Sequence, residues 1–314
     1  MKTISLLIIL GVAATAFYAL TMHTDSAAEV QFRDFIETQR VGYGTNDEYA
    51  FRLSVFSANL DRIAELNAAN PEATFGINQF GDRTPEEMSK LMGFSNPGVK
   101  NVVHKFTDDH KEVDWSNMWA KVKDQGQCGS CWAFSATAAF EARYALNNGA
   151  QTVSTLFSEQ ELVDCEPQSS GCNGGLMDFA FEYLEKNGFC TEEQYPYKAR
   201  DMTCSASKCT SGPMDSSYTD IEAGDEDSLL EALVNGPVAV AVDANTWSFY
   251  SGGILSSCGK SLDHGVTLIK YNPTEGSSTI RNSWGGSWGE KGTIRIKAGE
   301  DMCGYANAAS FPTF

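Results

Sequence analysis

The nine cysteines of this chain of 314 residues limit its fold more than any other feature, because all of them lie after residue 127. Two of them, Cys128 and Cys131, stand three positions apart in the stretch QGQCGSCWAFS. If the chain is secreted, eight cysteines can form four disulfides and one is left over, either as an intermolecular partner or as a reactive thiol. Alone, the C-x-x-C pair fits a redox site, half of a zinc site, or a nucleophile beside a structural cysteine.

The N-terminus indicates that the chain enters the secretory pathway. Lys2 precedes an apolar stretch over residues 4–20, which ends with the small residues Ala14 and Ala16. A basic start, a short apolar core and a small-residue exit predict a signal peptide over residues 1–20, whereas the stretch is marginally short for a membrane anchor. The net charge of −18 argues against nucleic acid or an anionic membrane as a partner, and we expect no stable membrane insertion.

The cysteine-free part is expected to form a helical domain of its own. Helix formers without glycine or proline predict a helix over residues 47–67. One face of this helix carries a stripe of mixed polarity, whose polar members need partners on a second helix, expected over residues 31–39. The stripe consists of Glu48, Arg52, Phe56, Asn59, Ile63 and Asn67. A compact segment with a motif at alternate positions follows, made of Gly76, Asn78, Phe80 and Asp82. A polar linker with glycine and proline over residues 95–110 then marks a domain boundary.

The cysteine-bearing part changes from a helical to a strand pattern along its length. Helices are predicted at residues 131–148, 158–165 and 174–188, and Gly149 ends the first of them. Strands are predicted within PVAVAVDA, HGVTLIKY, STIRNSWG and GTIRIK, which are separated by turns rich in glycine, serine and proline. A helical half over about residues 125–215 and a strand half over about 216–308 predict two lobes with a cleft between them.

A reactive thiol at Cys131 would need a base, and the chain has four histidines from which to supply it. Cys131 is expected in the first turn of its helix, where unpaired N–H groups and the helix dipole favour a thiolate. Three histidines, His23, His104 and His110, lie in the first part or its linker, which leaves His264. Asn282, on the next predicted strand, is the candidate that orients the imidazole. Each of these signals is weak alone, and their coexistence with an odd cysteine strengthens them.

The motifs QGQCGSCWAF, CNGG, DHGV and NSWG, in this order and at these spacings, resemble those of the papain family of cysteine peptidases. The first part resembles the inhibitory propeptide of the cathepsin L branch, because all six stripe residues match its ERFNIN motif and the alternating segment matches the companion motif. The resemblance covers essentially the whole chain after the signal peptide. It implies an α+β, papain-like two-lobe fold with a helical left lobe, a β-barrel-like right lobe and a helical inhibitory propeptide. The propeptide is expected over residues 21–110 and the peptidase domain over 111–314.

The resemblance also implies roles for individual residues. Cys131 takes the place of the nucleophile, His264 that of its base and Asn282 that of the group holding the ring. Gln125 and the backbone N–H of Cys131 match the family's oxyanion hole, and Trp284 is expected to shield the bond between His264 and Asn282. Three cystines correspond to family bridges, and the two cysteines left over are expected to form a fourth. The implied pairs are Cys128–Cys172, Cys165–Cys204, Cys258–Cys303 and Cys190–Cys209.

The same resemblance implies how substrate binds. The backbone of Gly174 and Gly175 is expected to pair with an extended peptide, with Asp263 beside it. The pocket for the side chain second upstream of the cut would be lined by Leu176, Met177, Ala241, Leu262 and Ala308. Because this set carries no charge, we expect Leu, Phe or Val to be preferred there and Arg to be rejected.

Regulation, partners and location follow from the resemblance as well. The propeptide should run through the cleft, in the direction opposite to substrate, and acid should trigger self-activation. Expected partners are peptide and protein substrates and proteinaceous inhibitors of cysteine proteases, and we expect a monomer without cofactor or metal. The destination would be a lysosome-like vacuole or the exterior.

The chain departs from the family pattern at one place: the segment between Trp115 and Gln125 is shorter than expected. A pseudoprotease and a redox protein remain the competing interpretations.

Overall fold

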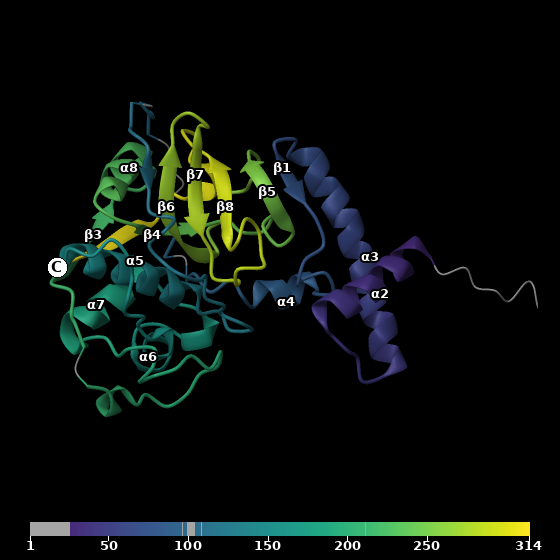
Figure 1. Ribbon diagram of the computed structural model, residues 1–314, viewed down its shortest axis with the longest axis horizontal. Helices are drawn as coiled ribbons and strands as arrows, with labels where there is room; N and C mark the ends of the chain where they lie inside the picture. Colours follow the sequence, from purple (N-terminus) through teal and green to yellow (C-terminus); the bar gives the residue numbers. More distant parts are fainter. Residues whose placement is uncertain (1–25, 96, 99–103, 108, 211) are drawn as a thin grey trace, which may run out of the picture. The chain divides into compact units, whose positions relative to one another are not determined.

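The structure is a computed structural model that describes residues 26–95, 97–98, 104–107, 109–210 and 212–314 (Figure 1). The predicted signal peptide and His23 lie outside these residues. The chain divides into two compact units, one ending at Leu60 and one spanning Asp61–Phe314. Among the described residues, none of the helices is long and apolar enough to cross a membrane.

The first unit consists of two helices held together by aromatic side chains. Helix α2 spans Ala27–Gln39 and begins at Ser26, whose hydroxyl accepts a hydrogen bond from the Glu29 N–H at 3.1 Å. Helix α3 spans Asn46–Ala69, so its first part belongs to this unit. The ring of Phe56 lies 5.2 Å and 5.3 Å, between centroids, from the rings of Phe32 and Phe35, and these three side chains form the buried centre of the unit.

The second unit is organised around a sheet of nine strands. The strands run β1-β5-β8-β7-β6-β4-β9-β3 from one edge to the other, and β2 pairs with β6 outside this path. All pairs are antiparallel except the parallel pair of β5 and β8. The strands span Ala73–Phe75 (β1), Val113–Asp114 (β2), Ser217–Ile221 (β3), Val238–Val242 (β4), Tyr250–Leu255 (β5), His264–Asn272 (β6), Ser277–Arg281 (β7), Thr293–Lys297 (β8) and Ala309–Thr313 (β9).

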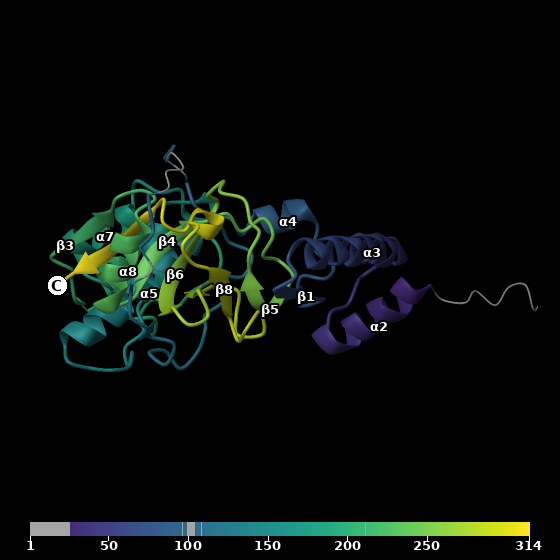
Figure 2. The ribbon, with the colours of Figure 1, turned by 90° about the horizontal axis from the view of Figure 1, so that it is seen from above.

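The expectation of a barrel-like lobe needs a correction, because this sheet does not close. Its two end strands, β1 and β3, each pair with a single neighbour among the described strands. One of these end strands, β1, comes from the cysteine-free part of the chain and lies beside β5 (Figure 2). The sheet is therefore an open one that the predicted propeptide extends at one edge.

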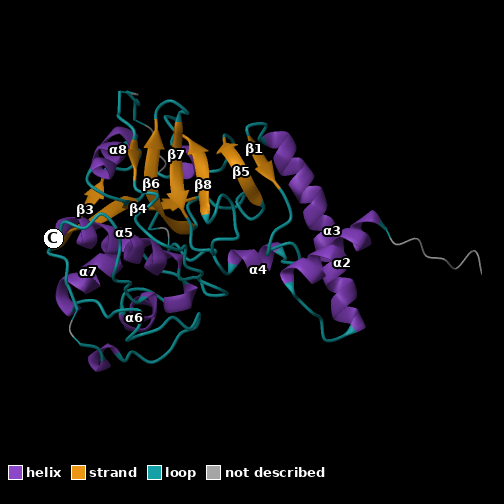
Figure 3. Ribbon diagram, viewed as in Figure 1, coloured by secondary structure: helices purple, strands orange, loops and turns teal. Residues whose placement is uncertain are grey.

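Helices of the second unit gather mainly on one side of this sheet, as Figure 3 shows for α5, α6 and α7. Three predicted helices are found close to their expected bounds, and Gly149, with φ of 74°, follows the end of α5. The strand half also contains α8, which was not predicted. The helices span Pro85–Ser89 (α4), Cys131–Asn147 (α5), Glu159–Cys165 (α6), Met177–Asn187 (α7) and Glu226–Val234 (α8), with short 3-10 turns at Gly171–Asn173, Ala206–Lys208 and Met302–Gly304.

The cores of the second unit include residues from the predicted propeptide. Phe75, Phe80, Met88 and Leu91 are buried in the apolar core that contains the sheet residues of β6 and β7. Phe94 is buried in a different core, which surrounds α5 and α7. A single stretch of the predicted propeptide therefore packs into both of these cores.

Candidate active site

The sheet brings His264 and Asn282 together, as the sequence suggested. His264 is the first residue of β6, Asn282 follows the last residue of β7, and these two strands are antiparallel neighbours. The His264 Nε2 atom lies 2.8 Å from the Asn282 side-chain oxygen. Because that oxygen can only accept, Nε2 carries the proton and Nδ1 is the free acceptor. His104 and His110 lie elsewhere, beside Glu222 and Asp227.

Cys131 is the free cysteine of the described residues, and it is buried at the first position of α5. Its sulfur accepts hydrogen bonds from two backbone N–H groups, that of Gly265 at 3.3 Å and that of Gly93 at 3.1 Å. Gly265 directly follows His264, so the first contact joins Cys131 of the helical lobe to the residue beside the candidate base of the strand lobe. The second contact comes from the predicted propeptide.

Gln125 and Trp284 lie around this pair. The Gln125 amide nitrogen donates to the carbonyl oxygens of Leu91 and Cys128, each at 2.8 Å, and its oxygen accepts from the Ser283 hydroxyl at 2.7 Å. The Trp284 ring lies 4.9 Å from the His264 ring, between centroids, and it is buried. The Trp284 ring therefore packs against the histidine ring, and its role as a shield against water stays a prediction.

The disulfides resolve which cysteine of the C-x-x-C stretch remains a thiol. Cys128 is joined to Cys172, and the Gly129 N–H donates to the Cys172 carbonyl at 2.9 Å, so the approach to α5 is fixed to the CNGG segment. The four cystines are the pairs that the resemblance implied: Cys128–Cys172, Cys165–Cys204, Cys190–Cys209 and Cys258–Cys303. A redox pair of Cys128 with Cys131 does not fit this pairing.

A segment of the predicted propeptide, residues 91–95, covers the thiol. The Gly175 N–H donates to the Gly93 carbonyl at 2.9 Å, and the Ser95 N–H donates to the Gly175 carbonyl at 3.0 Å. The Phe94 N–H donates to the Asp263 carbonyl at 3.0 Å, and the bridge between Phe94 and Gly175 is parallel. Gly174 also lies close to this segment, since a Cβ atom added there would lie 3.1 Å from the Gly93 carbonyl oxygen.

Only glycine fits at position 93 without a shift of the backbone. A Cβ atom at Gly93 would lie 1.8 Å from the Gly129 carbonyl oxygen, far inside van der Waals contact. Sequence reasoning missed Gly93 and its apolar neighbours Leu91 and Phe94. Their signal was a short apolar run around a glycine, placed between the alternating motif and the polar linker.

Phe94 fills the predicted pocket. It belongs to one apolar core with Leu176, Met177, Ala241 and Leu262, and Ala308 packs against that core. The cavity beside Phe94 is nevertheless lined by two carboxylates as well. They belong to Asp178, in the first turn of α7, and to Asp220, on β3 opposite Ser310 of β9. These two residues lie outside the predicted set, so the expectation of an uncharged pocket stays a prediction.

The protonation states differ from those expected of a free active site. Burial, offset in part by the N–H groups of Gly265 and Gly93, raises the pKa of the Cys131 thiol to about 11. Burial also lowers the pKa of His264 to about 4, against the effect of its bond to Asn282. The expected thiolate and imidazolium are thus a neutral thiol and a neutral imidazole while residues 91–95 cover them, because neither charge is solvated.

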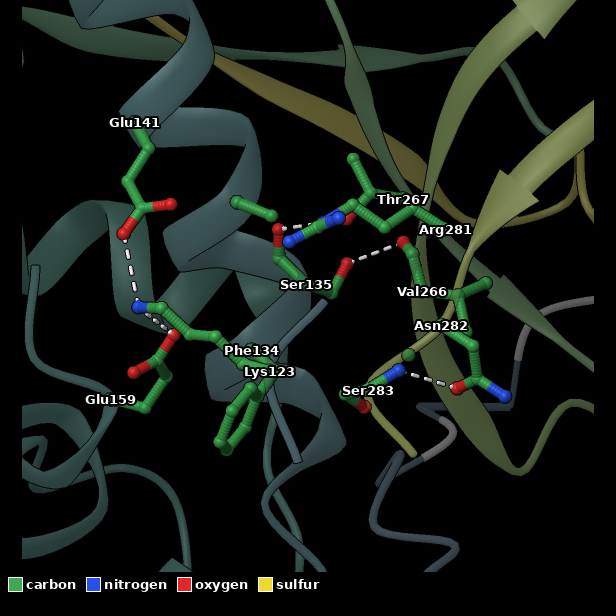
Figure 4. Close-up of a pocket in the computed structure, with 12 residues that line it drawn as sticks. Lys123, Phe134, Ser135, Glu141, Glu159, Val266, Thr267, Arg281, Asn282 and Ser283 are labelled. Carbon is green, nitrogen blue, oxygen red and sulfur yellow. Dashed lines mark hydrogen bonds and ion pairs between the residues drawn. The ribbon is translucent and has the colours of Figure 1, made fainter. Parts of the chain in front are cut away.

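A buried charged network, also missed by sequence reasoning, lines one pocket together with Asn282 (Figure 4). The Lys123 ammonium group donates to Glu141 at 3.0 Å and to Glu159 at 2.7 Å. Arg281, one residue before Asn282, donates to the Lys121 carbonyl and stacks on Trp119 at 4.7 Å from the ring centroid. The position of Glu159 at the start of α6 gave no sign that its side chain would be buried.

The propeptide motifs anchor their segment to the strand lobe. Asn67, at the end of the helical stripe, holds β1 by donating to the Phe75 carbonyl at 3.0 Å and accepting from the Phe75 N–H at 2.9 Å. In the alternating motif, Asn78 donates to the Ser248 carbonyl at 2.8 Å and Phe80 meets the Trp284 ring edge-on at 5.5 Å. The other motif residues of this unit are also in place: Ile63 and Asp82 are buried, and Gly76 donates to Phe249.

Comparison with known proteins identifies this arrangement. Residues 110–313 match the model of the papain family cysteine proteases. The chain belongs to the papain family. Residues 32–88 match the cathepsin propeptide inhibitor domain, so this papain-family chain also carries an inhibitory propeptide.

Several relatives of this papain-family protease match it over most of its length. Cysteine protease XCP2 of Arabidopsis thaliana is 40% identical over 90% of this chain and 85% of its own length. Cathepsin L 2 of Paramecium tetraurelia is 41% identical over 86% of this chain and 88% of its own. Among solved structures, digestive procathepsin L 3 of the Tenebrio molitor larval midgut is 37% identical, with a TM-score of 0.78, and the match covers 92% of this chain and 100% of that one.

Proposed function

We propose that this papain-family protease is a cysteine endopeptidase, made as a zymogen, that cleaves peptide bonds through Cys131 and His264. The observation that carries the proposal is the free Cys131 thiol at the start of α5, which accepts a hydrogen bond from Gly265, the residue after the histidine that Asn282 holds. After the propeptide leaves, water and the helix dipole would stabilise a thiolate, and Nδ1 of His264 would accept the proton. The pKa of Cys131 would then fall well below the value of the covered thiol.

The reaction would proceed in two steps. The Cys131 sulfur attacks the peptide carbonyl carbon, the C–N bond breaks, and His264 gives its Nδ1 proton to the departing amine. His264 then takes a proton from water, whose oxygen attacks the thioester carbon, and the acid leaves as the thiolate re-forms. Gln125 would stabilise the negative oxygen of each intermediate, and its side chain already donates to a peptide carbonyl, that of Leu91.

Substrate would occupy the cleft that residues 91–95 fill. Gly175 already makes two backbone hydrogen bonds with this segment, which supports main-chain pairing with a peptide. Phe94 supports a preference for hydrophobic side chains second upstream of the cut, because it is only 9% exposed among Leu176 and Met177. The parallel bridge to Gly175 fits a propeptide that runs opposite to substrate and so resists cleavage.

The signal peptide predicted from the sequence, together with relatives that carry the name cathepsin L, supports a place in the secretory pathway. The destination would be a lysosome-like vacuole or the exterior. Protein inhibitors of cysteine proteases are expected partners, and the boundary between propeptide and peptidase domain is proposed near residue 110.

Acid treatment of the purified proenzyme, followed by a thiol-alkylating epoxide and mass mapping, tests this function. We expect one modified residue per mature chain, Cys131, and loss of all peptidase activity with it. The Cys131→Ala proenzyme should stay unprocessed alone at acidic pH. Modification of another residue, or maturation of this variant by itself, would refute the proposal. Peptide substrates that differ only at the second upstream position should favour Phe over Asp in kcat/KM.

A further inference from the structure

Two carboxylates of the strand lobe share one amide side chain next to the active site. Asp263 directly precedes His264 at the start of β6, and Asp243 directly follows β4, the strand that pairs with this part of β6. The Asn245 side-chain nitrogen donates to the Asp243 Oδ1 atom and to the Asp263 Oδ2 atom, each at 2.9 Å. Since an amide nitrogen carries two protons, both are used, and Asn245 bridges the two carboxylates.

The Asp243 side of this bridge is fixed to the fold. Its Oδ1 atom also accepts from the Asn245 N–H at 3.1 Å, and its Oδ2 atom accepts from the Ser261 N–H at 2.9 Å. The Asp243 N–H donates to the carbonyl of Cys303 at 2.8 Å, and Cys303 is joined to Cys258 by a disulfide. Because Asp243 is buried and held by both side chain and backbone, it gives the Asn245 amide a rigid base.

The Asp263 side of the bridge depends on this amide. The Asp263 Oδ1 atom accepts from the Ala244 N–H at 2.9 Å, and its Oδ2 atom has Asn245 as its donor. Burial and the charge of Asp243 raise the pKa of Asp263 to about 6, while the hydrogen bonds from Ala244 and Asn245 act in the opposite direction. Lys260, the cation of the same loop, is engaged elsewhere, because it pairs with Asp301 at 3.1 Å.

The charge of Asp263 reaches the nucleophile. Burial is the main cause that raises the pKa of the Cys131 thiol, and the negative charge of Asp263 raises this pKa further. A Cys131 thiolate paired with a protonated His264 must therefore form beside this carboxylate, whose charge opposes the thiolate and favours the imidazolium. The ionisation of Asp263 thus bears on both partners of the pair.

We propose that Asn245 is a positioning residue of this peptidase, which holds the Asp263 side chain in place and keeps it ionised beside Cys131 and His264. Asn245 acts through Asp263 and does not touch the reacting atoms. The inference rests on the proposed function, since it assigns a role in the same reaction. Without the amide, Asp263 Oδ2 loses its donor while the charge of Asp243 remains, so Asp263 is protonated at a higher pH and its charge is lost there.

A titration of the Asp263 carboxyl by ¹³C NMR in the Cys131→Ala proenzyme tests the bridge without peptidase activity. Asn245→Ala removes the amide and should move the midpoint up by about one pH unit, since a hydrogen bond to a charged group changes an ionisation constant about tenfold. Asn245→Gln keeps an amide and should reverse most of this shift. Ser261→Ala is the matched control, because its N–H still bonds to Asp243, and it should leave the midpoint unchanged. Asn245 is exposed, so these variants are expected to fold.

The second measurement is the rate at which iodoacetamide alkylates Cys131 after the propeptide has been removed, because the thiolate is the reactive form. In Asn245→Ala, the step in the pH profile that follows Asp263 should move up by about one pH unit, in alkylation and in kcat/KM alike, at an unchanged melting temperature. An unchanged carboxyl midpoint, an unchanged alkylation profile, or a shift that Asn245→Gln does not reverse would overturn the inference. Absence of peptide cleavage by the unsubstituted enzyme would instead refute the proposed function, and the alkylation profile would still decide the role of Asn245.

Discussion

The side chain of Phe94 should supply a large part of the force that keeps the zymogen closed. Phe94→Ala removes a ring that is 91% buried among Leu176, Met177 and Leu262, since its exposed fraction is 9%. Burial of a phenylalanine side chain contributes about 2 kcal/mol, so the equilibrium constant for lifting residues 91–95 off the site should rise about 30-fold. The backbone hydrogen bonds of this segment do not depend on the ring and would remain.

The assay is the rate at which a thiol-reactive epoxide modifies Cys131 in the full proenzyme at neutral pH, because the reagent reaches the sulfur only in the open state. We expect about a 30-fold faster rate for Phe94→Ala at an unchanged melting temperature of the peptidase domain. The matched control is Ser95→Ala, which keeps the bond from the residue 95 N–H to Gly175 and should change the rate by less than about threefold. An unchanged rate in Phe94→Ala would show that the apolar pocket does not hold the propeptide, and the reasoning would fail.

Three further predictions concern titration and cross-linking. In the proenzyme, His264 should titrate near pH 4 in side-chain ¹⁵N NMR spectra, and a midpoint above pH 6 would contradict the neutral pair. Burial, with Glu185 nearby, raises the pKa of Asp215 to about 8, and both its carboxylate oxygens lack hydrogen-bond partners. Between about pH 4 and 8 the folded state therefore binds more protons at this residue than the unfolded state does. The free energy of unfolding should accordingly fall as the pH rises through this range. Asp215→Asn should raise the melting temperature of the Cys131→Ala proenzyme at pH 7.5 by about 5 °C and leave it unchanged at pH 4, whereas an equal shift at both would refute this cause. Replacing Cys190 and Cys209 together by alanine opens a loop of 19 residues and should lower the free energy of unfolding by about 3 kcal/mol in a denaturant titration.

The parts of this protein that local chemistry dictates could be read from the sequence. The helix at Cys131, the strands at His264 and before Asn282, and the glycine that ends α5 all follow from periodicity and turn residues. Residue roles and disulfide partners came from the family motifs, because spacing alone does not choose among pairings of eight cysteines.

What the sequence did not show depends on contacts between distant segments. Helix α8 begins at Glu226 after an ordinary N-cap, Asp225, but it lies in a stretch dominated by strands and its pattern was too short to stand out. Asp178 and Asp220 line the cavity beside Phe94 because α7 and β3 both contribute to it, which no local pattern reveals. The raised pKa of the Cys131 thiol likewise results from burial, to which Gly93, some forty positions away in sequence, contributes by contact with the sulfur.

Loss of the propeptide would have a second effect besides opening the cleft, because strand β1 would leave the sheet with it. Residues 73–75 complete one margin of the sheet by pairing with β5. Once the propeptide is gone, the Ile254 N–H and the Phe249 carbonyl lose their bonds to Glu72 and Gly76, and another extended chain can be added to this edge of the sheet. Maturation would thus leave this edge of the sheet unpaired, and its two glycines, Gly252 and Gly253, would weaken the pairing of any chain added there.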